Sequence, residues 1–321
     1  MTRLDSEDDV SHPHPDWMTS IIQWLQREGN PKMTMLSSQH VRRGVTVIGA
    51  VAFIACAVIP AFAGQEANMT EQKQQAVELL KSIETGDPQP LAYINSDKYI
   101  QHNLAVADGL AGVKALLQSL PKGSAKVDTV RVFQDGDFVF MQTEYDFFGP
   151  KIGFDIFRFE GGKIVEHWDN LQETAAKPSP SGHTMIDGPT IASDLDKTDA
   201  NKALMRSYMD DLLHGRREKF TGYFDGNNYI QHNPWVADNL TGLLAGLQAL
   251  AKDGKAVKYQ RVEKVLGEGS FVLVVSEGTF GDRPTAYYDL YRVKNGKIAE
   301  HWDTLEAIPP REDWKNPNGK F

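Results

Sequence analysis

The chain has 321 residues, of which 41% are hydrophobic and 24% charged, and its formal net charge is −9 at pH 7. This composition is typical of a globular protein with room for two average domains, and it excludes a disordered chain or a membrane bundle. The acidic balance, without any cluster of Lys and Arg, argues against a nucleic-acid partner. The single cysteine, Cys56, lies in an apolar stretch, so the domains after it contain neither disulfides nor thiolate metal sites.

The N-terminal region carries the pattern of an export signal. An apolar stretch at residues 44–63 follows Arg42 and Arg43 and ends in Ala-Phe-Ala. A basic start, an apolar middle and a small-residue ending predict a signal peptide over residues 33–63, cleaved after Ala63, and hence a periplasmic or secreted protein. The alternative is a membrane-anchored protein, because about 20 apolar residues can span a bilayer if the segment stays uncleaved.

Residues 1–32 are acidic and polar, which is unusual ahead of a signal peptide. We interpret them as a non-native extension, with the natural start at Met33 or Met35. If they are native, they form a cytoplasmic tail, and the membrane anchor becomes the better interpretation.

The following segment predicts two helices and then a set of strands. Thr70 can cap the first helix, and Pro121 ends the second. From residue 126 to residue 169 the apolar pattern changes to strands separated by Gly-containing turns. These elements place a first domain at residues 68–173. Apolar residues recur at helical spacing in both helices, first Ala76, Leu79, Leu80 and Ile83, and then Leu110, Val113, Leu116, Leu117 and Leu120.

The same order of elements returns in the second half of the chain. Residues 174–197 are rich in Pro, Ser, Gly and Asp without an apolar period, which predicts a linker. Two helices and four strands then predict a second domain at residues 198–307, and residues 308–321 are expected to form an extended C-terminal arm. Helices followed by a run of antiparallel strands indicate α+β domains.

Two polar motifs show that the halves are copies of one unit. Tyr-Ile-Gln-His-Asn occurs at residues 99–103 and 229–233. Gly-Lys-Ile-x-Glu-His-Trp-Asp follows at nearly the same distance, at residues 162–169 and 296–303. Long polar motifs do not recur in the same order by chance, so the chain is a tandem repeat.

The last hairpin of each repeat decides where the polar side chains point. A three-residue turn at residues 160–162 would place Asp155 opposite His167, with Asp169 on the same face, and its left-handed third position suits Gly162. A two-residue turn would instead place Asp155 opposite Trp168. We choose the three-residue turn, which gathers Asp155, His167 and Asp169 on one face and, in the second repeat, Asp289, His301 and Asp303.

Two carboxylates and one imidazole on a single face are costly to bury for packing alone. If that face lines a cavity, these groups can transfer protons, because burial and a second carboxylate raise the pKa of a carboxyl group. The alternative is a solvent-facing polar strip whose side chains hydrogen-bond to the backbone.

The motifs resemble those of a known family. Tyr-x-Gln-His-Asn, Asp-Ile-Phe-Arg at residues 155–158 and the Glu-His-Trp-Asp motif together resemble the SnoaL-like polyketide cyclases, and more narrowly the predicted SnoaL-like aldol-condensation-catalysing proteins. The second repeat matches with Asp-Leu-Tyr-Arg at residues 289–292 and the Pro-Pro-Arg-Glu-Asp-Trp tail. The resemblance covers residues 68–173 and 198–321.

The resemblance implies a fold. Such proteins belong to the nuclear-transport-factor-two-like superfamily, together with ketosteroid isomerase. The expected architecture is therefore two tandem α+β cones, each with helices packed on a curved, mostly antiparallel sheet. Single-domain relatives commonly dimerise through their sheets, so we expect an internal pseudo-dimer, with a further homodimer as an additional option.

The resemblance also implies an activity. It points to an exported enzyme that performs cofactor-free acid–base catalysis, of the aldol-condensation, cyclisation or isomerisation type, on a small hydrophobic or carbonyl-containing molecule. The alternative is a periplasmic protein that binds a small molecule in the same cones without turning it over.

Each candidate residue has an expected role and an alternative one. Asp169 and Asp303 are expected to be the proton-transfer bases. His167 and His301 would either stabilise an enolate oxygen or orient the neighbouring Asp. By resemblance to ketosteroid isomerase, the catalytic set also includes Asp155 and Asp289 as pocket acids, although each could instead form a salt bridge to an Arg.

The first polar motif is expected to bind substrate, again by resemblance. Its residues would come from the rim of the pocket, and the alternative for its histidines is a backbone-bonded corner between helix and sheet. The expected substrate-binding residues are Gln101, His102, Asn103, Gln231, His232 and Asn233.

No metal and no other cofactor is expected. The predicted domains contain no Cys, no close pair of His on a helix and no Gly-rich phosphate loop. Trp168 and Trp302 are expected to be packing residues on the outer face of each sheet, where the two repeats meet.

Overall fold

The computed structural model describes residues 69–120, 123 and 125–321. Residues 1–63, which contain the predicted extension and the signal or anchor segment, lie outside the described residues. No helix within the described ranges is long and apolar enough to cross a membrane.

The first domain begins with helix α3 (Glu71–Thr85), as the sequence predicts. The Oγ1 atom of Thr70 accepts a hydrogen bond from the backbone N–H of Lys73 at 3.2 Å, and Gly86 ends the helix with a left-handed φ of 69°. The remaining elements are η1 (Gln89–Tyr93), β1 (Ile100–Gln101), α4 (Gly109–Ser119), β2 (Lys126–Asp135), β3 (Phe138–Asp146), β4 (Pro150–Glu160) and β5 (Lys163–Glu173).

The second domain repeats this order. After the short η2 (Leu195–Lys197), a long helix opens the domain and a second helix precedes four long strands. Its elements are α5 (Thr198–Leu213), η3 (Arg217–Tyr223), η4 (Gly226–Asn228), β6 (Ile230–Gln231), α6 (Asn239–Lys252), β7 (Val257–Glu268), β8 (Phe271–Phe280), β9 (Arg283–Lys294) and β10 (Lys297–Ala307).

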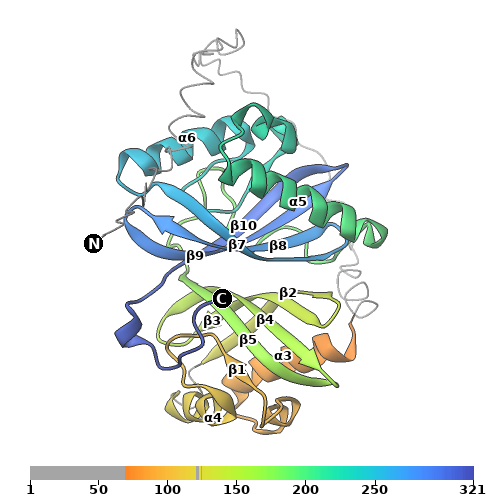
Figure 1. Ribbon diagram of the computed structural model, residues 1–321, viewed down its shortest axis with the longest axis vertical. Helices are drawn as coiled ribbons and strands as arrows, with labels where there is room; N and C mark the ends of the chain where they lie inside the picture. Colours follow the sequence, from red (N-terminus) through yellow and green to blue (C-terminus); the bar gives the residue numbers. More distant parts are fainter. Residues whose placement is uncertain (1–68, 121–122, 124) are drawn as a thin grey trace, which may run out of the picture.

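The two sheets have the same strand order. The first is β1-β5-β4-β3-β2 and the second is β6-β10-β9-β8-β7. Only the two-residue strands β1 and β6 run parallel to their neighbours, and every other pair is antiparallel. In each domain the helices cover one face of the sheet, as Figure 1 shows. The predicted α+β class and the two tandem, mostly antiparallel sheets are confirmed.

The last hairpin of each domain corrects the predicted turn. The loops have two residues, Gly161-Gly162 and Asn295-Gly296, all with positive φ, as a type I′ turn requires. In the strand that follows each turn, a single residue has no partner on the neighbouring strand and forms a bulge. This residue is Val165 in the first domain and Ala299 in the second. Asp155 therefore pairs with Asp169, and not with His167 as the three-residue turn predicts.

The outer faces of the two sheets pack against each other (Figure 1). A single hydrophobic cluster joins residues of both domains, among them Phe133, Trp168, Phe271 and Trp302. Each tryptophan also receives a cation from the opposite domain, because Arg131 lies 4.4 Å from the ring of Trp302 and Lys264 lies 4.2 Å from the ring of Trp168. This interface is the internal pseudo-dimer expected for the repeat.

Two irregular segments cross between the domains in opposite directions. Residues 174–188 leave β5 and reach the second domain, where the carbonyl of Thr184 accepts a hydrogen bond from His232. Residues 308–321 leave β10 and reach the first domain, where the carbonyl of Gly319 accepts the corresponding bond from His102. The C-terminal segment, dark blue in Figure 1, runs down beside the first domain. Each domain is thus covered by a strap that follows the last strand of the other.

Candidate functional site

The bulged hairpin places three polar side chains of each domain on the face that the helices cover. Asp289 lies opposite Asp303 across β9 and β10, and His301 lies two residues before Asp303 on the same face. All three side chains are buried, as are their counterparts Asp155, His167 and Asp169. The solvent-facing strip is therefore excluded, and the predicted gathering of these groups is observed in both domains.

In the second domain the two nitrogens of His301 are both engaged. Its Nδ1 lies 2.9 Å from the side-chain oxygen of Gln231, and its Nε2 lies 3.0 Å from Oδ1 of Asp289. Gln231 is fixed in this orientation because its amide nitrogen donates to the hydroxyl of Tyr229 at 3.0 Å, so Nδ1 must carry a proton. Burial lowers the pKa of His301, but the bond to Asp289 and the charges of both aspartates outweigh burial and raise that pKa above its usual value.

The first domain builds the same network. His167 Nδ1 lies 3.0 Å from the side-chain oxygen of Gln101, and its Nε2 lies 3.2 Å from Oδ1 of Asp155. Gln101 again donates to a tyrosine hydroxyl, that of Tyr99, at 3.2 Å. Burial, as the largest cause, raises the pKa of Asp155, against the opposing effect of its bond to His167.

A tyrosine hydroxyl completes each network, but from a different strand. Tyr145 on β3 donates to Oδ2 of Asp155 at 2.6 Å. In the second domain the equivalent position is Gly278, and Tyr259 on the neighbouring strand β7 instead places its hydroxyl 3.1 Å from Asp289. Gly278 has no room for a side chain, because an added Cβ would lie 1.9 Å from the carbonyl of Lys258. Each domain therefore has a hydrogen bond between a tyrosine hydroxyl and its buried aspartate, although the tyrosine comes from β3 in the first domain and from β7 in the second.

The two Asp residues that close the motifs each accept one hydrogen bond from an Asn. Asn233 Nδ2 donates to Oδ2 of Asp303 at 2.7 Å, and Asn103 Nδ2 donates to Oδ2 of Asp169 at 2.5 Å. Gln101, Gln231, Asn103 and Asn233 therefore belong to the same clusters as the aspartates, and their expected role in substrate binding stays a prediction. Their contacts in the structure position the His and Asp side chains.

The second oxygen of Asp303 is free. Among the described residues, Oδ1 of Asp303 has no hydrogen-bond partner. Asp303 and His301 line a cavity of about 60 Å³ whose other walls are mostly aromatic, including Tyr208, Tyr229 and Tyr291. Burial, as the largest cause, and the nearby charge of Asp289 raise the pKa of Asp303 to about 6, against the opposing effects of His301 and Asn233. A buried carboxylate with this pKa and a free oxygen can accept a proton near neutral pH.

The corresponding oxygen in the first domain faces a cation. Lys320, on the C-terminal arm, is buried with its Nζ 3.5 Å from Oδ1 of Asp169 and 2.7 Å from Oε2 of Glu306. Burial lowers the pKa of Lys320, but the charges of Glu306 and Asp169 outweigh it and raise that pKa. Oδ1 of Asp169, like Oδ1 of Asp303, has no hydrogen-bond partner among the described residues, so the nearby cation of Lys320 is the main chemical difference between the two carboxylates.

His102 and His232 lie on the other face of each sheet. His232 Nε2 lies 2.9 Å from Oε1 of Glu300, and its ring stacks on Trp302 with 4.5 Å between centroids. His102 makes the equivalent contacts with Glu166, at 3.0 Å, and Trp168. This corrects their expected position at the pocket rim, since neighbouring residues of a strand point to opposite faces. The alternative role, a backbone-bonded corner, agrees with their bonds to Gly319 and Thr184.

The cone clusters also contain groups that bind metals in other proteins. Asp155, His167 and Asp169 offer three ligand atoms within 4.8 Å of one another, as do Asp289, His301 and Asp303. In each cluster the Nε2 atom of the histidine faces an aspartate and its Nδ1 atom faces the side-chain oxygen of a Gln. The expectation that the cones bind no metal stays a prediction.

Several residues of the network were not predicted from the sequence. Tyr145, Tyr259 and Lys320 contact the clusters but lie outside both motifs. Glu166 and Glu300 lie inside the second motif and hold the histidines of the first. The repetition of Glu in both copies of that motif was the available signal for the latter pair.

Comparisons with known proteins identify the first domain. Residues 76–167 match the model of the SnoaL-like domain family, and the first domain is a SnoaL-like domain. The second domain repeats its strand order. None of the curated proteins matches the chain.

Solved structures that resemble this chain each cover about one domain. TsrD from Streptomyces laurentii is 20% identical, with a TM-score of 0.28, over 33% of this chain and 92% of that chain. A candidate ketosteroid isomerase from Kribbella flavida is 22% identical, with a TM-score of 0.28, over 36% of this chain and 84% of that chain. An LEH-like epoxide hydrolase of M. tuberculosis is 17% identical, with a TM-score of 0.28, over 32% of this chain and 83% of that chain.

Replacement of Asp303 by Asn is expected to stabilise the protein at neutral pH. The folded-state pKa of about 6 exceeds the usual value of 3.8, so protonation favours the folded state below pH 4, and this stabilisation is lost as the pH rises through 6. The free energy of unfolding of Asp303→Asn, relative to wild type, should rise by about 2–3 kcal/mol between pH 4 and pH 7.5. Urea unfolding at both pH values measures it. The exposed Asp282→Asn is the control, and an equal, pH-independent effect of both variants would contradict the assignment.

Replacement of Lys320 by Met is expected to destabilise the first domain. It would leave the buried carboxylate of Asp169 and the half-buried carboxylate of Glu306 without a cation, at a cost of about 3–5 kcal/mol at neutral pH. The loss should shrink in acid, where these carboxylates are protonated. Lys315→Met, on the exposed part of the same arm, is the control in urea unfolding. If the two variants lose the same stability at pH 7.5, the ion pair does not have this role.

Proposed function

We propose that the second domain catalyses proton transfer on a small, largely apolar carbonyl compound, without a cofactor, and that Asp303 is the base. The observation that supports this most directly is that Asp303 lines an aromatic cavity while its buried Oδ1 has no hydrogen-bond partner among the described residues. A buried carboxylate oxygen without a partner is costly to keep, and burial, as the largest cause, raises the pKa of Asp303 to about 6.

The proposed reaction begins at a carbon next to a carbonyl group. Asp303 removes a proton from that carbon, and the electron pair moves onto the carbonyl oxygen to give an enolate. Protonated Asp303 returns the proton to another carbon in an isomerisation. In an aldol closure the enolate carbon first bonds to a second carbonyl carbon, and the proton goes to the alkoxide formed there.

Tyr229 is the proposed donor to the enolate oxygen. It lines the same cavity as Asp303, and its hydroxyl accepts a bond from Gln231, which leaves its own proton for a ligand. Burial, above all, raises the pKa of Tyr229 far above its usual value, so the phenol stays protonated. His301 then orients the cluster and contributes positive charge beside both aspartates, because neither of its nitrogens is free to bind the oxygen.

The first domain is proposed to have a structural role. Its Asp169 is paired with Lys320, and two positions that carry Tyr287 and Tyr291 in the second domain are Gly153 and Phe157 in the first. We therefore assign turnover to the second cone alone.

Hydrogen exchange in D2O tests this proposal. A panel of small apolar ketones and aldehydes is incubated with the full chain, and loss of the proton next to the carbonyl is followed by NMR. Exchange should rise with pH and reach half of its maximum near pH 6, and Asp303→Asn should slow it by about 10²–10⁴-fold. Tyr229→Phe should also slow it while leaving the pH dependence in place.

Asp169→Asn distinguishes the two cones in the same assay. Exchange that survives Asp169→Asn but not Asp303→Asn supports the second cone as the site. An equal loss in both variants would overturn that assignment. Compounds that bind in the cavity without any exchange would favour the alternative, a binding protein that does not turn its ligand over.

Export remains part of the proposal. It rests on the basic start, apolar middle and Ala-Phe-Ala ending of residues 33–63. Mass spectrometry of the protein recovered from expressing cells should give a chain that begins at Gly64 and is found outside the cytoplasm. A chain that keeps residues 44–63 and sediments with membranes would favour the anchor instead.

A further inference from the structure

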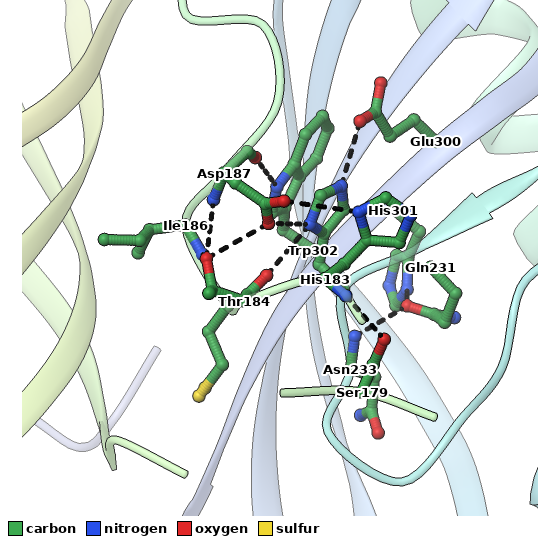
Figure 2. A network of polar contacts seen from close by, with 12 residues as sticks. Ser179, His183, Thr184, Ile186, Asp187, Gln231, Asn233, Glu300, His301 and Trp302 are labelled. Atoms are coloured by element: carbon green, nitrogen blue, oxygen red, sulfur yellow. Dashed lines mark hydrogen bonds and ion pairs between the residues drawn. The ribbon is translucent and has the colours of Figure 1, made fainter. Parts of the chain in front are cut away.

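The strap that crosses onto the second domain meets His232 in a cluster of two imidazoles and one carboxylate. His183 Nδ1 lies 3.2 Å from Oδ2 of Asp187, and His232 Nδ1 lies 2.8 Å from Oδ1 of the same side chain. One ligand atom from each residue lies within 4.8 Å of the other two. Figure 2 shows Thr184 and Asp187 beside Trp302, whose indole N–H donates to the carbonyl of Asp187 at 2.8 Å.

The outward nitrogen of each histidine is held by a further carboxylate. His183 Nε2 lies 3.2 Å from Oδ2 of Asp238, and His232 Nε2 lies 2.9 Å from Oε1 of Glu300. Histidines that bind a metal almost always donate their other N–H to a carboxylate or carbonyl in this way, which fixes the tautomer and aims the free nitrogen. Here the nitrogen of each histidine that faces the cluster is Nδ1, and both Nδ1 atoms lie within hydrogen-bond distance of Asp187.

We propose that His183, His232 and Asp187 bind one divalent transition-metal ion of the zinc class. Two imidazole nitrogens and one carboxylate oxygen are the donor set that such ions favour. In a tetrahedral site the donor atoms are about 3.3 Å apart. The two Nδ1 atoms lie 3.2 and 2.8 Å from the two oxygens of Asp187, and one ligand atom from each residue lies within 4.8 Å of the others. The carbonyl oxygen of Thr184 also lies beside this cluster, 2.9 Å from His232 Nδ1. The ion replaces the protons that Nδ1 would otherwise share with these oxygens.

The cluster is charged and accessible as a cation site should be. Three carboxylates surround the two imidazoles, because Asp187 contacts both rings while Asp238 and Glu300 contact one ring each. The side chains of His183 and Asp187 are 29% and 45% exposed. A pocket of about 310 Å³, lined in part by His183 and His232, opens beside them. An ion can therefore enter from solvent and keep a water in its open position.

The first domain has only a fragment of this arrangement. His102 is held by Glu166 at Nε2 and by the carbonyl of Gly319 at Nδ1. The arm that covers it, residues 316–321, carries neither His nor a carboxylate side chain. The proposal therefore requires one ion per chain, bound where the strap that joins the two domains is fixed to the second.

Metal titration of the full chain, without a histidine tag and after removal of metals by chelation, tests the proposal. Calorimetry with ZnCl2 should give one ion per chain, and CoCl2 should give a visible absorption band of the same stoichiometry. His183→Ala and Asp187→Asn should each weaken binding at least tenfold, and Asp238→Asn should weaken it about 10–100-fold. Zinc should raise the thermal midpoint of the wild type but not that of His183→Ala.

His214→Ala is the matched control, because His214 is an exposed histidine paired with an Asp four residues away but with no second histidine. It should bind zinc as the wild type does. Unchanged binding in both His183→Ala and Asp187→Asn, or no binding in the wild type, would overturn the proposal. Loss of binding in His301→Ala with retention in His183→Ala would place the ion in the second cone and would equally overturn it. A folded state common to all variants is checked by circular dichroism.

Discussion

Alternation of side chains along the last strand of each domain is the constraint on which the rest of the molecule depends. Neither face of that strand is open to water: one is packed on the opposite sheet, and the other is covered by helices. The motif Glu-His-Trp-Asp therefore sends Glu300 and Trp302 to the interface between the domains, and His301 and Asp303 into the cone. Both sets are buried, so both must satisfy their polar groups inside the protein.

In the second domain the polar groups of Glu300 and Trp302 at the interface all have hydrogen-bond partners, whereas those of the cone set do not. One carboxylate oxygen of Glu300 is hydrogen-bonded to His232 and the other to Arg292, so both oxygens have partners. Asp303 lines an aromatic cavity, and its buried Oδ1 has no hydrogen-bond partner in the part of the chain that the structure describes. Since the two domains share every residue of the motif, the difference arises outside it, where Lys320 pairs with Asp169 in the first cone only. A C-terminal arm that belongs to the second domain thus determines the chemistry of the first.

Much of the fold and part of the site could be predicted from the sequence. The recurrence of long polar motifs specified the repeat, and the change from helical to strand spacing specified the order of elements. The hairpin prediction gave Asp155 the wrong partner but the right face. The two-residue turn and its bulge move the partner of Asp155 by two residues, from the predicted His167 to Asp169, and residues two apart on a strand share a face. The bulge at Val165 could not be predicted, since nothing in the local sequence distinguishes it from its neighbours.

The remaining errors have a common physical origin. His102 and Gln101 were treated as one substrate-binding group, although strand alternation sends them to opposite faces. Lys320 and His183 lie in segments without periodicity, and their contacts with Asp169 and His232 are set by how the straps cross between domains. Contacts of this kind depend on tertiary geometry and leave no local pattern in the sequence.

The central claim is that Asp303 is a buried carboxylate that is free to change its protonation near neutral pH. Selective labelling of the aspartate side-chain carboxyl carbons with ¹³C, followed by NMR over a pH titration, measures this directly. One resonance should titrate near pH 6 and be absent from the spectrum of Asp303→Asn. If the resonance that disappears in Asp303→Asn titrates near pH 4 in the wild type, Asp303 is an ordinary solvated carboxylate, and the account of the second cone as an acid–base site is wrong.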